Sequence, residues 1–253
     1  MQGHTPCPQC KDRHRDRKGD NLYIYPDGHG FCFACGYRVD ASIKKRLEAL
    51  DDQPMPTNIQ LPSDTTSTLP AQVLEWLGKY GIKQHETRDF DMMWSPSHHW
   101  LIFPIYNDVF KETLIGFQAR NFGSSGTKYY TRGTFEKIIN YYDQKNLQKP
   151  EKSVILVEDM ISAIKVSRQF STMPIFGSFL THERAGRLHL FFDRLIFWLD
   201  YDKSISAFHQ ATRMKQTGWL TSVIITPKDP KEYSDEEIAD IINFDNSDLN
   251  PCV

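Results

Sequence analysis

Four cysteines near the N-terminus have the side-chain type and the spacing to bind a metal ion. Cys7 and Cys10 form one Cys-x-x-Cys pair, and Cys32 and Cys35 form a second pair. Structural Zn²⁺ is usually held by four thiolate or imidazole ligands in a tetrahedron, and each Cys-x-x-Cys turn offers two sulfurs to one metal with little strain. The spacing therefore predicts one structural zinc ion.

Other arrangements of these cysteines stay open at the level of sequence. They could form two disulfides, or they could be four unrelated buried thiols. His4, His14 and His29 lie nearby, so one imidazole could replace a sulfur ligand. The fifth cysteine, Cys252, is expected to be a free thiol. Because the chain shows no signal-peptide pattern and no long apolar run, we expect a cytoplasmic protein, in which thiols stay reduced and bind metal.

The residues around the cysteines predict a β zinc-ribbon domain over residues 1–48. Residues 22–33 are expected to form a β-hairpin that turns at Asp27-Gly28. The formal net charge of −2 argues against a protein that coats DNA through bulk charge. Residues 11–18 are nevertheless basic, which fits either a solvated loop or a surface that contacts phosphates.

The composition changes sharply after the cysteine-containing region. Residues 49–68 are rich in proline, aspartate, serine and threonine and are predicted to form a flexible linker. Residues 69–150 predict a small α+β subdomain, with strands expected at 100–106, 113–120 and 128–132. Its first helix is indicated by apolar side chains at helical spacing, which are Val73, Leu74, Leu77 and Tyr80.

Strands and helices alternate over residues 151–233. The expected strands are 153–157, 174–177, 194–199 and 222–226, and the expected helices between them are 160–170, 182–190 and 204–217. This alternation predicts an α/β fold with a parallel sheet, in which ligands bind outside the carboxyl ends of the strands. The tail, residues 234–253, is acidic and partly amphipathic, so either a packed final helix or a docking peptide is expected.

Acidic side chains follow three of these predicted strands. Glu158 follows the first, Asp200 and Asp202 follow the third, and Asp229 follows the fourth. Carboxylates are ligands that Mg²⁺ prefers, and a bound metal can polarise a phosphoryl oxygen and lower the pKa of a bound hydroxyl or water. An isolated Asp-x-Asp is usually a solvated turn, but four carboxylates at strand ends of one alternating unit predict a divalent-metal site.

Three segments of this unit resemble the acidic motifs of the Toprim domain, which primases, topoisomerases and some nucleases share. They are VILVEDMISAIKV, FWLDYDKSISA and ITPKDPKEY. GSFLT fits the loop after the second strand in bacterial-type primases, and LIFPIY, LIGFQAR and KYY are similar to the basic subdomain that precedes Toprim in those enzymes. With the four-cysteine ribbon in front, the order resembles a DnaG-type DNA primase, most closely the primase half of phage primase-helicases. The resemblance covers residues 4–48 and 69–233.

The resemblance implies a fold and a set of site residues. The fold is a Rossmann-like Toprim sheet, preceded by a small α+β subdomain and an N-terminal β zinc ribbon that helps to select the start site on the template. Glu158, Asp200 and Asp202 would hold Mg²⁺ or Mn²⁺, and Asp229 falls on the later acidic position. The basic residues that match phosphate-contacting positions are Arg120 and Lys128, with Lys228 beside Asp229 and with Arg132 and Lys137 as weaker candidates.

The resemblance also implies an activity. A DNA primase joins ribonucleoside triphosphates on single-stranded DNA by two-metal nucleotidyl transfer. The 3′-hydroxyl of one nucleotide attacks the α-phosphorus of another, and pyrophosphate leaves. The expected partners are the template, the nucleotides and a separate helicase or DNA polymerase, since the chain contains no P-loop motor motif. The location would be the host cytoplasm if the protein is phage-encoded, and no membrane is involved. The alternatives are a Toprim nuclease and a non-catalytic single-stranded-DNA-binding module.

Two residues depart from the family pattern. After Glu158 the family usually has glycine, whereas this chain has Asp159, and where an acidic residue is common this chain has Ser162. Residues four apart on a helix are neighbours, so Ser162 is expected at the same edge of the sheet as Glu158. A hydroxyl can hold a metal-bound water but cannot replace a negative charge. We therefore expect one firmly bound divalent ion, with a second recruited mainly by the incoming triphosphate.

Overall fold

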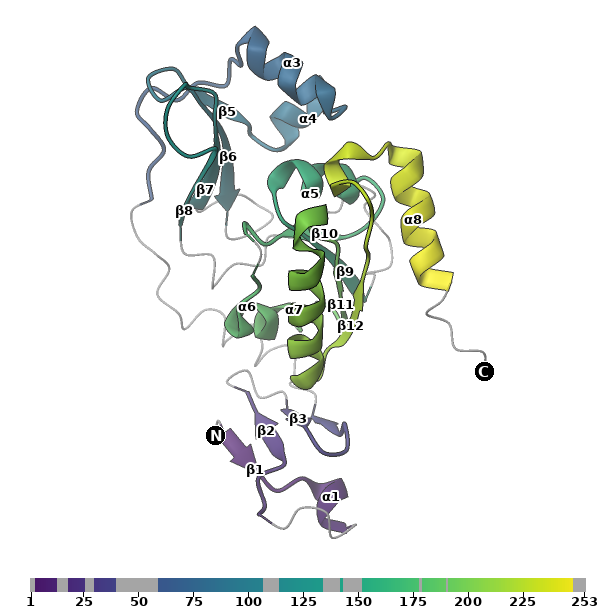
Figure 1. Cartoon of the computed structure of the whole chain (residues 1–253). Helices are drawn as coiled ribbons and strands as arrows, with labels where there is room; N and C mark the ends of the chain where they lie inside the picture. The colour runs from purple at the N-terminus through teal and green to yellow at the C-terminus, as the bar shows by residue number, and fades with distance from the viewer. Residues whose placement is uncertain are drawn as a thin grey trace. The chain divides into compact units, whose positions relative to one another are not determined.

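The computed structural model describes residues 3–12, 18–25, 30–39, 59–106, 114–133, 142, 152–177, 179–189 and 191–247 (Figure 1). The chain divides into two compact units. The first contains residues 1–55 together with 212–221, and the second contains residues 56–211 and 222–253. No helix within the described ranges combines the length and the apolarity needed to cross a membrane.

The N-terminal unit is built on a small antiparallel sheet. Its strands β1 (Gly3–Thr5), β2 (Leu22–Ile24), β3 (Gly30–Cys32) and β4 (Arg38–Val39) are paired in that order, and the short helix α1 (Pro8–Asp12) carries Cys10. The register that pairs Leu22 with Cys32 confirms the predicted hairpin, although its predicted turn at Asp27-Gly28 lies outside the described residues. Leu22 packs with the buried cysteines, so the core of this unit is largely the cysteine cluster itself.

The second unit begins with an antiparallel sheet of four strands, β5 (Met93–Ser95), β6 (Trp100–Tyr106), β7 (Leu114–Asn121) and β8 (Tyr129–Gly133). Two helices accompany it, α3 (Ala71–Lys79) and α4 (Gln84–Asp89). Val73 and Leu77 of α3 pack into one core cluster with Leu101 of β6, as their helical spacing predicts. Leu74 was expected in this core but is 44% exposed, because it lies about 100° around the helix from Val73.

Part of the predicted linker belongs to this folded unit. Ile59 and Leu61 pack against the face of the sheet that carries Ile102 and Phe117. Further along, Thr66 forms an antiparallel bridge with Trp94, and Asp64 accepts hydrogen bonds from the Ser95 hydroxyl and the Ser97 amide, both at 2.7 Å. The prediction of a flexible linker is therefore wrong for residues 59–68, because their few apolar side chains suffice to cover one sheet face. Residues 49–58 lie outside the described part of the chain.

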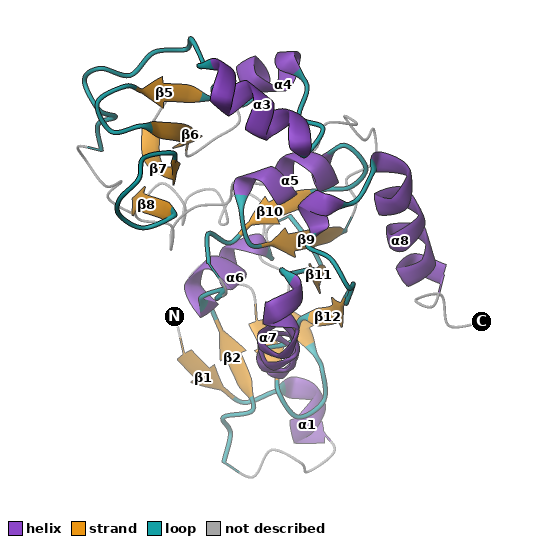
Figure 2. Cartoon of the chain, turned by 45° about the horizontal axis from the view of Figure 1, so that its top comes forward, coloured by secondary structure: helices purple, strands orange, loops and turns teal. Residues whose placement is uncertain are grey.

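The second sheet of this unit is formed by β9 (Ser153–Val157), β10 (Thr172–Pro174), β11 (Arg194–Phe197) and β12 (Leu220–Val223), in the order β10-β9-β11-β12 (Figure 2). Both β10 and β11 run parallel to β9. Its helices are α5 (Met160–Ser167), α6 (His182–Leu188) and α7 (Ser204–Gln216). The predicted α/β alternation and fold class are thus confirmed.

Two predicted strands of this sheet are shifted. The second was expected at 174–177 but ends at Pro174, because Phe176 and Gly177 have positive φ angles of 56° and 149° and cannot continue an extended strand. The fourth was expected at 222–226 but begins at Leu220 and ends at Val223. In both cases apolar loop residues extend the hydrophobic run beyond the strand, so the run alone misplaces the boundary.

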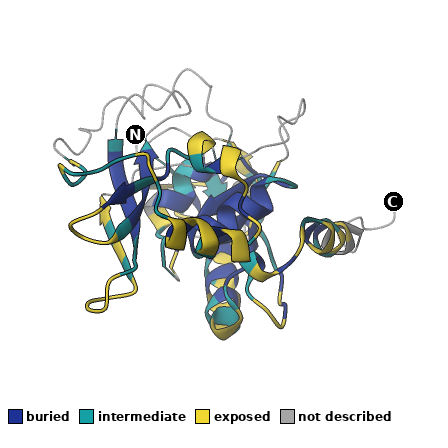
Figure 3. Ribbon diagram, turned by 90° about the horizontal axis from the view of Figure 1, so that it is seen from above, coloured by how far each residue is buried: buried dark blue, intermediate teal, exposed yellow. Residues whose placement is uncertain are grey.

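Helix α5 connects the two sheets through buried contacts. All eight of its residues are buried, and Met160, Ile161 and Ile164 share a core cluster with Leu101 of the first sheet (Figure 3). Ala163 and Val166 pack instead with the strands of the second sheet. The loop after β9 is therefore held between two cores. The tail helix α8 (Asp235–Ser247) also packs on the second sheet through Ile238 and Ile242, which favours the packed-helix alternative for the tail.

Candidate functional site

The four N-terminal cysteines form one cluster. The Sγ atoms of Cys7 and Cys35 lie 3.6 Å apart, as do those of Cys10 and Cys32, and all four sulfurs lie within 4.8 Å of one another. These distances are too long for disulfides, whose S–S bond is about 2.05 Å, but they approach the spacing of about 3.8 Å expected for sulfurs in a tetrahedron around zinc. The cluster therefore fits one zinc ion, and both the disulfide pairing and the unrelated-thiol alternative are wrong.

The environment of Cys10 adds to this interpretation. Burial, followed by hydrogen bonds with Cys35, Cys32 and Cys7, raises the pKa of Cys10 to about 12. Zinc binds thiolates, so a metal ion is what would deprotonate thiols in such a crowded site. His4, one of the nearby imidazoles, hydrogen-bonds through Nδ1 to the Asp20 carbonyl at 2.7 Å, whereas the other two, His14 and His29, lie outside the described residues.

The acidic residues lie at the ends of the strands that were predicted to carry them. Glu158 follows β9, and Asp200 precedes the short 3₁₀ helix η2 (Tyr201–Lys203) that follows β11. Asp229 caps a second 3₁₀ helix, η3 (Pro230–Glu232), in a reciprocal arrangement with Glu232. Its Oδ1 also accepts a hydrogen bond from the Tyr201 amide at 3.1 Å, which ties the loops after β11 and β12 together.

A lysine that the sequence analysis did not name lies among these carboxylates. Lys231 Nζ is 2.7 Å from Asp200 Oδ2, 2.9 Å from Asp159 Oδ2 and 3.1 Å from Asp229 Oδ2. Its side chain is only 12% exposed. The available signal was its position two residues after Asp229 in the third acidic motif, but a lysine in a polar loop is usually solvated and would not be singled out by sequence.

Asp159 has both of its oxygens engaged. Oδ1 accepts a hydrogen bond from the Ser162 amide at 2.8 Å and so caps the N-terminus of α5, and Oδ2 forms the ion pair with Lys231. Aspartate is a preferred N-cap residue because it satisfies an amide that has no partner within the helix. The departure from glycine at this position therefore has a structural consequence: it starts α5 and helps to hold Lys231.

Some buried polar atoms of the site have no partner within the described part of the chain. They are Glu158 Oε2, Asp200 Oδ1 and the Ser162 hydroxyl oxygen. Burial, and then the charge of Asp159, raises the pKa of Glu158 and raises that of Asp200 to about 7. A buried acceptor without a partner is costly, and a cation would supply the missing partner and favour the charged form of both carboxyl groups. These carboxylate oxygens fit a divalent ion in their donor chemistry.

Asp202 is placed differently from the other acidic residues. Its side chain is 70% exposed and pairs with Lys203 at 3.3 Å. Among the described residues, moreover, the cysteine cluster is the one group of three or more possible ligand side chains whose donor atoms all lie within 4.8 Å of one another. The structure thus brings Asp200, Asp159 and Asp229 together around Lys231, while Asp202 lies at the solvent-exposed end of the site.

Arg120 is the predicted basic residue with the most specific surroundings. Its guanidinium lies 5.4 Å from the ring centre of Trp76 and 5.0 Å from that of Tyr129, and its Nε and Nη1 atoms are buried with no hydrogen-bond partner among the described residues. Burial, and then the charge of Asp159, raises the pKa of Tyr129 to about 12, so this aromatic ring lies within electrostatic reach of the acidic site. Arg120 therefore presents unused donors beside that site, as a phosphate-binding arginine would.

The other predicted basic residues are exposed. Lys128 lies 5.8 Å from the ring centre of Tyr129, and Lys228 lies 5.5 Å from that of Tyr233. Both ammonium groups are therefore positioned over aromatic rings and open to solvent. Lys137 lies outside the described residues.

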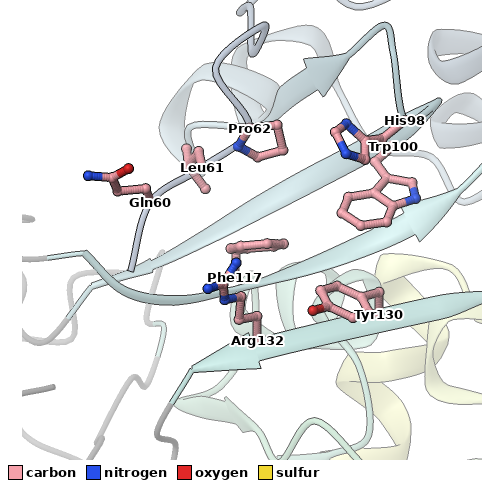
Figure 4. Close-up of a pocket in the computed structure, with 8 residues that line it drawn as sticks. All are labelled: Gln60, Leu61, Pro62, His98, Trp100, Phe117, Tyr130 and Arg132. Atoms are coloured by element: carbon pink, nitrogen blue, oxygen red, sulfur yellow. The ribbon is translucent and has the colours of Figure 1, made fainter. Parts of the chain in front are cut away.

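Arg132 lines a pocket of about 430 Å³ on the first sheet, which sequence reasoning did not identify (Figure 4). The rings of Trp100 and Tyr130 form its wall and are stacked, with centres 5.0 Å apart and planes 21° apart. The ring centre of His98 lies 4.7 Å from that of Trp100. Figure 4 shows the pocket between these aromatic side chains and the segment that carries Leu61 and Pro62. Because that segment was taken for a linker, the opposite wall of the pocket could not be foreseen.

Comparisons with known proteins return primases. The chain is 32% identical to a DNA primase of Borreliella burgdorferi over 113 residues, a match that covers 40% of this chain and 21% of that protein, or about a fifth of its length. No protein-family model matches the chain.

Solved structures match more of the chain. The zinc-binding and RNA polymerase domains of the Aquifex aeolicus primase align with a TM-score of 0.58 and 18% identity, covering 95% of this chain and 78% of that one. The primase fragment of the bacteriophage T7 primase-helicase aligns with a TM-score of 0.50 and 16% identity, covering 96% and 98%. At these identities the likeness concerns the fold. The chain therefore has the fold of the zinc-binding and RNA polymerase domains of DnaG-type primases.

Proposed function

We propose that this chain is a DNA primase, a template-dependent RNA polymerase that makes short RNA primers on single-stranded DNA. One observation supports this most. Buried, unpartnered oxygens of Glu158 and Asp200 follow strands of a primase fold, and Arg120, two of whose guanidinium nitrogens have no partner among the described residues, lies over the Tyr129 ring that senses the charge of Asp159. Nucleotidyl transfer requires cation ligands next to groups that donate hydrogen bonds to phosphate oxygens.

In this proposal Glu158, Asp200 and Asp202 hold divalent metal. A bound Mg²⁺ or Mn²⁺ would supply Lewis-acid stabilisation of the charge that develops on phosphate oxygens. Burial raises the pKa of Glu158 and of Asp200, and a bound cation would lower both pKa values. Asp202, which is exposed, would complete the ligand set from the solvent side together with triphosphate oxygens.

The basic residues would contact phosphates. Arg120 is held between two aromatic rings, so its fork of donors is oriented before a ligand arrives and loses little conformational freedom on binding. Lys128 and Lys228 are exposed lysines over aromatic rings, and they would add charge with less directional preference. Asp229 would act by holding Lys231 and capping η3.

The aromatic pocket would receive bases of the template. Stacking on aromatic rings is a sequence-tolerant way to bind single-stranded nucleic acid, and Arg132 at the pocket supplies a charge for the backbone. The zinc ribbon would contribute to selection of the start site. A solved structure shows a DnaG primase catalytic domain bound to single-stranded DNA, which is consistent with a template surface on this fold. A replicative helicase or DNA polymerase would be a separate partner, and the expected location is the cytoplasm.

A primer-synthesis assay separates this function from its alternatives. The zinc-loaded protein is incubated with single-stranded DNA, labelled ribonucleotides and Mg²⁺ or Mn²⁺. Short RNA products that depend on template and on all required nucleotides are expected. Degradation of the template would instead indicate a Toprim nuclease, and a mobility shift without either product would indicate a DNA-binding module.

A pair of matched variants guards the assay against contaminating polymerases. Glu158→Gln removes a charge from the acidic site and should abolish the products. Asp193→Asn removes an exposed charge that pairs with Lys152 at 3.6 Å and should leave them unchanged. Equal product from the wild type and Glu158→Gln would contradict the assignment of the acidic site.

A further inference from the structure

Lys231 satisfies three carboxylates at once. An ammonium group has three N–H donors, and Lys231 Nζ is 2.7 Å, 2.9 Å and 3.1 Å from one oxygen of Asp200, Asp159 and Asp229, respectively. It is therefore surrounded by oxygens as a small metal cation would be. Its side chain is only 12% exposed, so these carboxylates rather than water are its main partners.

The backbone fixes this lysine in place. Lys231 lies within η3, whose first residue is Pro230 and whose ends are joined by the reciprocal capping of Asp229 and Glu232. Pro230 is buried, and the Asp229 amide donates to Glu232 at 3.1 Å. The ammonium is thus delivered by a short, rigid turn rather than by a mobile loop, which limits the entropy lost on forming three ion pairs.

The two carboxyl oxygens of Asp200 have different surroundings. Its Oδ2 accepts from Lys231, whereas its Oδ1 is buried and has no partner among the residues that the structure describes. Glu158 Oε2 and the Ser162 hydroxyl oxygen share this second condition. Lys231 therefore satisfies one oxygen of Asp200, while the other oxygen of Asp200 and Glu158 Oε2 still lack a partner among the described residues.

A purely structural ion pair does not account for this composition. Three carboxyl groups, those of Asp159, Asp200 and Asp229, face a single ammonium, and Asp200 Oδ1 and Glu158 Oε2 stay without a partner among the described residues. Burying carboxyl oxygens without partners costs free energy, and a cation would supply the missing partner. The arrangement fits a site completed by one additional divalent ion better than a closed structural cluster.

We propose that Lys231 occupies one of the two cation positions of the acidic site, so that the chain binds one divalent ion of its own, on the side of Glu158 and Asp200 Oδ1. This inference rests on the proposed function, since it deepens the account of the same acidic site. It also gives Asp159 a role: Asp159 holds the lysine, and both of its oxygens are engaged without a metal.

The test is a Mn²⁺ titration of the zinc-loaded full chain, without nucleotide or DNA. Free Mn²⁺ is followed by electron paramagnetic resonance, and the heat of binding is followed by calorimetry. The wild type should bind about one Mn²⁺, and Lys231→Gln, which frees three carboxylates, should bind about two. The control Lys152→Gln removes an exposed lysine, 83% exposed, at the other end of β9 and should bind as the wild type does.

Thermal unfolding keeps the test valid if Lys231→Gln is unstable. The variant should melt at a lower temperature than the wild type, and Mn²⁺ should restore its midpoint by more than it raises that of the wild type, since a metal replaces the missing charge. Lys231→Arg, which keeps the charge, should stay at one ion. Two ions on the wild type, or one ion and no extra Mn²⁺ stabilisation for Lys231→Gln, would overturn the inference.

These measurements separate the inference from the proposed function. They need no nucleotide and no product, so a wild type that makes no primers but shows the stated change in stoichiometry would contradict the polymerase assignment alone. A wild type that makes primers but binds two ions without nucleotide would contradict the role of Lys231 alone.

Discussion

Two buried cations of the second unit are both surrounded by carboxylates, yet their surroundings differ. Arg168, at the end of α5, donates to both oxygens of Glu86 at 2.8 and 2.5 Å, to Asp235 at 2.7 Å and to the Gly81 carbonyl at 2.9 Å. Glu86 also accepts from the Lys83 amide. Lys231 likewise uses its donors, but it leaves buried oxygens of the same site without partners.

The difference is the one expected between a cluster that supports the fold and a cluster that binds a ligand. The Arg168 cluster ties α4, α5 and α8 together, and its acceptors are largely satisfied by protein groups. The Lys231 cluster also joins three loops, but Asp200 Oδ1 stays buried without a partner among the described residues. Perturbed carboxyl groups with unmet partners are what a ligand site requires, whereas a structural cluster is complete without a ligand.

The largest effect on stability is expected from Arg168→Leu. The Arg168 and Glu86 side chains are 9% and 1% exposed, so the substitution leaves a buried carboxylate without its partner. We expect a loss of about 3–5 kcal/mol of unfolding free energy in urea titrations, and Mg²⁺ should not recover it. Lys79→Ala, which breaks a pair with Glu75 that is more than half exposed, should cost about 0.5 kcal/mol or less. Equal losses would mean that burial does not distinguish the two pairs.

The second prediction concerns the acidic site, where a substitution should change activity strongly and stability little. Asp202→Asn is nearly isosteric and removes an exposed charge, so unfolding free energy should change by less than about 0.5 kcal/mol. Primer synthesis should fall by about 10²-fold or more, because a proposed metal ligand is lost. Parallel urea titrations and product counts on the same preparation measure both quantities. Activity near that of the wild type would exclude Asp202 as a ligand.

Sequence patterns identified the acidic residues that follow the strands, but not the lysine that pairs with them. The acidic residues after β9 and β11 could be located because these buried strands are continuous apolar runs, whereas Asp229 was located although the end of β12 was misplaced. Lys231 could not, because its role depends on a 3₁₀ turn that brings residues from three loops together. The same limit applies to residues 59–68, whose polar composition predicts a linker while Ile59 and Leu61 pack on a sheet.

The cysteines were the easier case. Their spacing within one short segment restricts the geometry strongly, so the metal site follows from sequence alone, and the structure brings all four sulfurs together. The acidic site is assembled from residues 72 positions apart, such as Asp159 and Lys231. Its partners are therefore set by tertiary packing, and sequence can name the acidic candidates without stating which of them are paired.

The third prediction is a dependence of stability on pH that only one of the two clusters should show. Burial, and then Asp159, raises the pKa of Asp200 from 3.8 to about 7, while Arg168 has its pKa raised further above the physiological range. Between pH 4 and pH 7 the folded protein should keep a proton on Asp200 that the unfolded chain has lost. The folded state binds more protons there, so stability should fall as the pH rises through this window.

Mg²⁺ should weaken this fall in stability with rising pH if the site binds metal. The ion binds the ionised carboxylate, so it should raise the unfolding midpoint more at pH 7.5 than at pH 5, and the fall across the window should shrink. The control is Asp200→Asn. It keeps the histidines and the other carboxyl groups of the chain and removes only the carboxyl group of Asp200. The difference between the two proteins, measured by thermal unfolding at a series of pH values, isolates the acidic cluster. The difference in unfolding midpoint between the wild type and Asp200→Asn could instead be flat with pH, or Mg²⁺ could leave it unchanged. Either result would mean that the fold tolerates the unpartnered oxygen of Asp200 without binding a cation there. The contrast with Arg168 would then be one of packing alone.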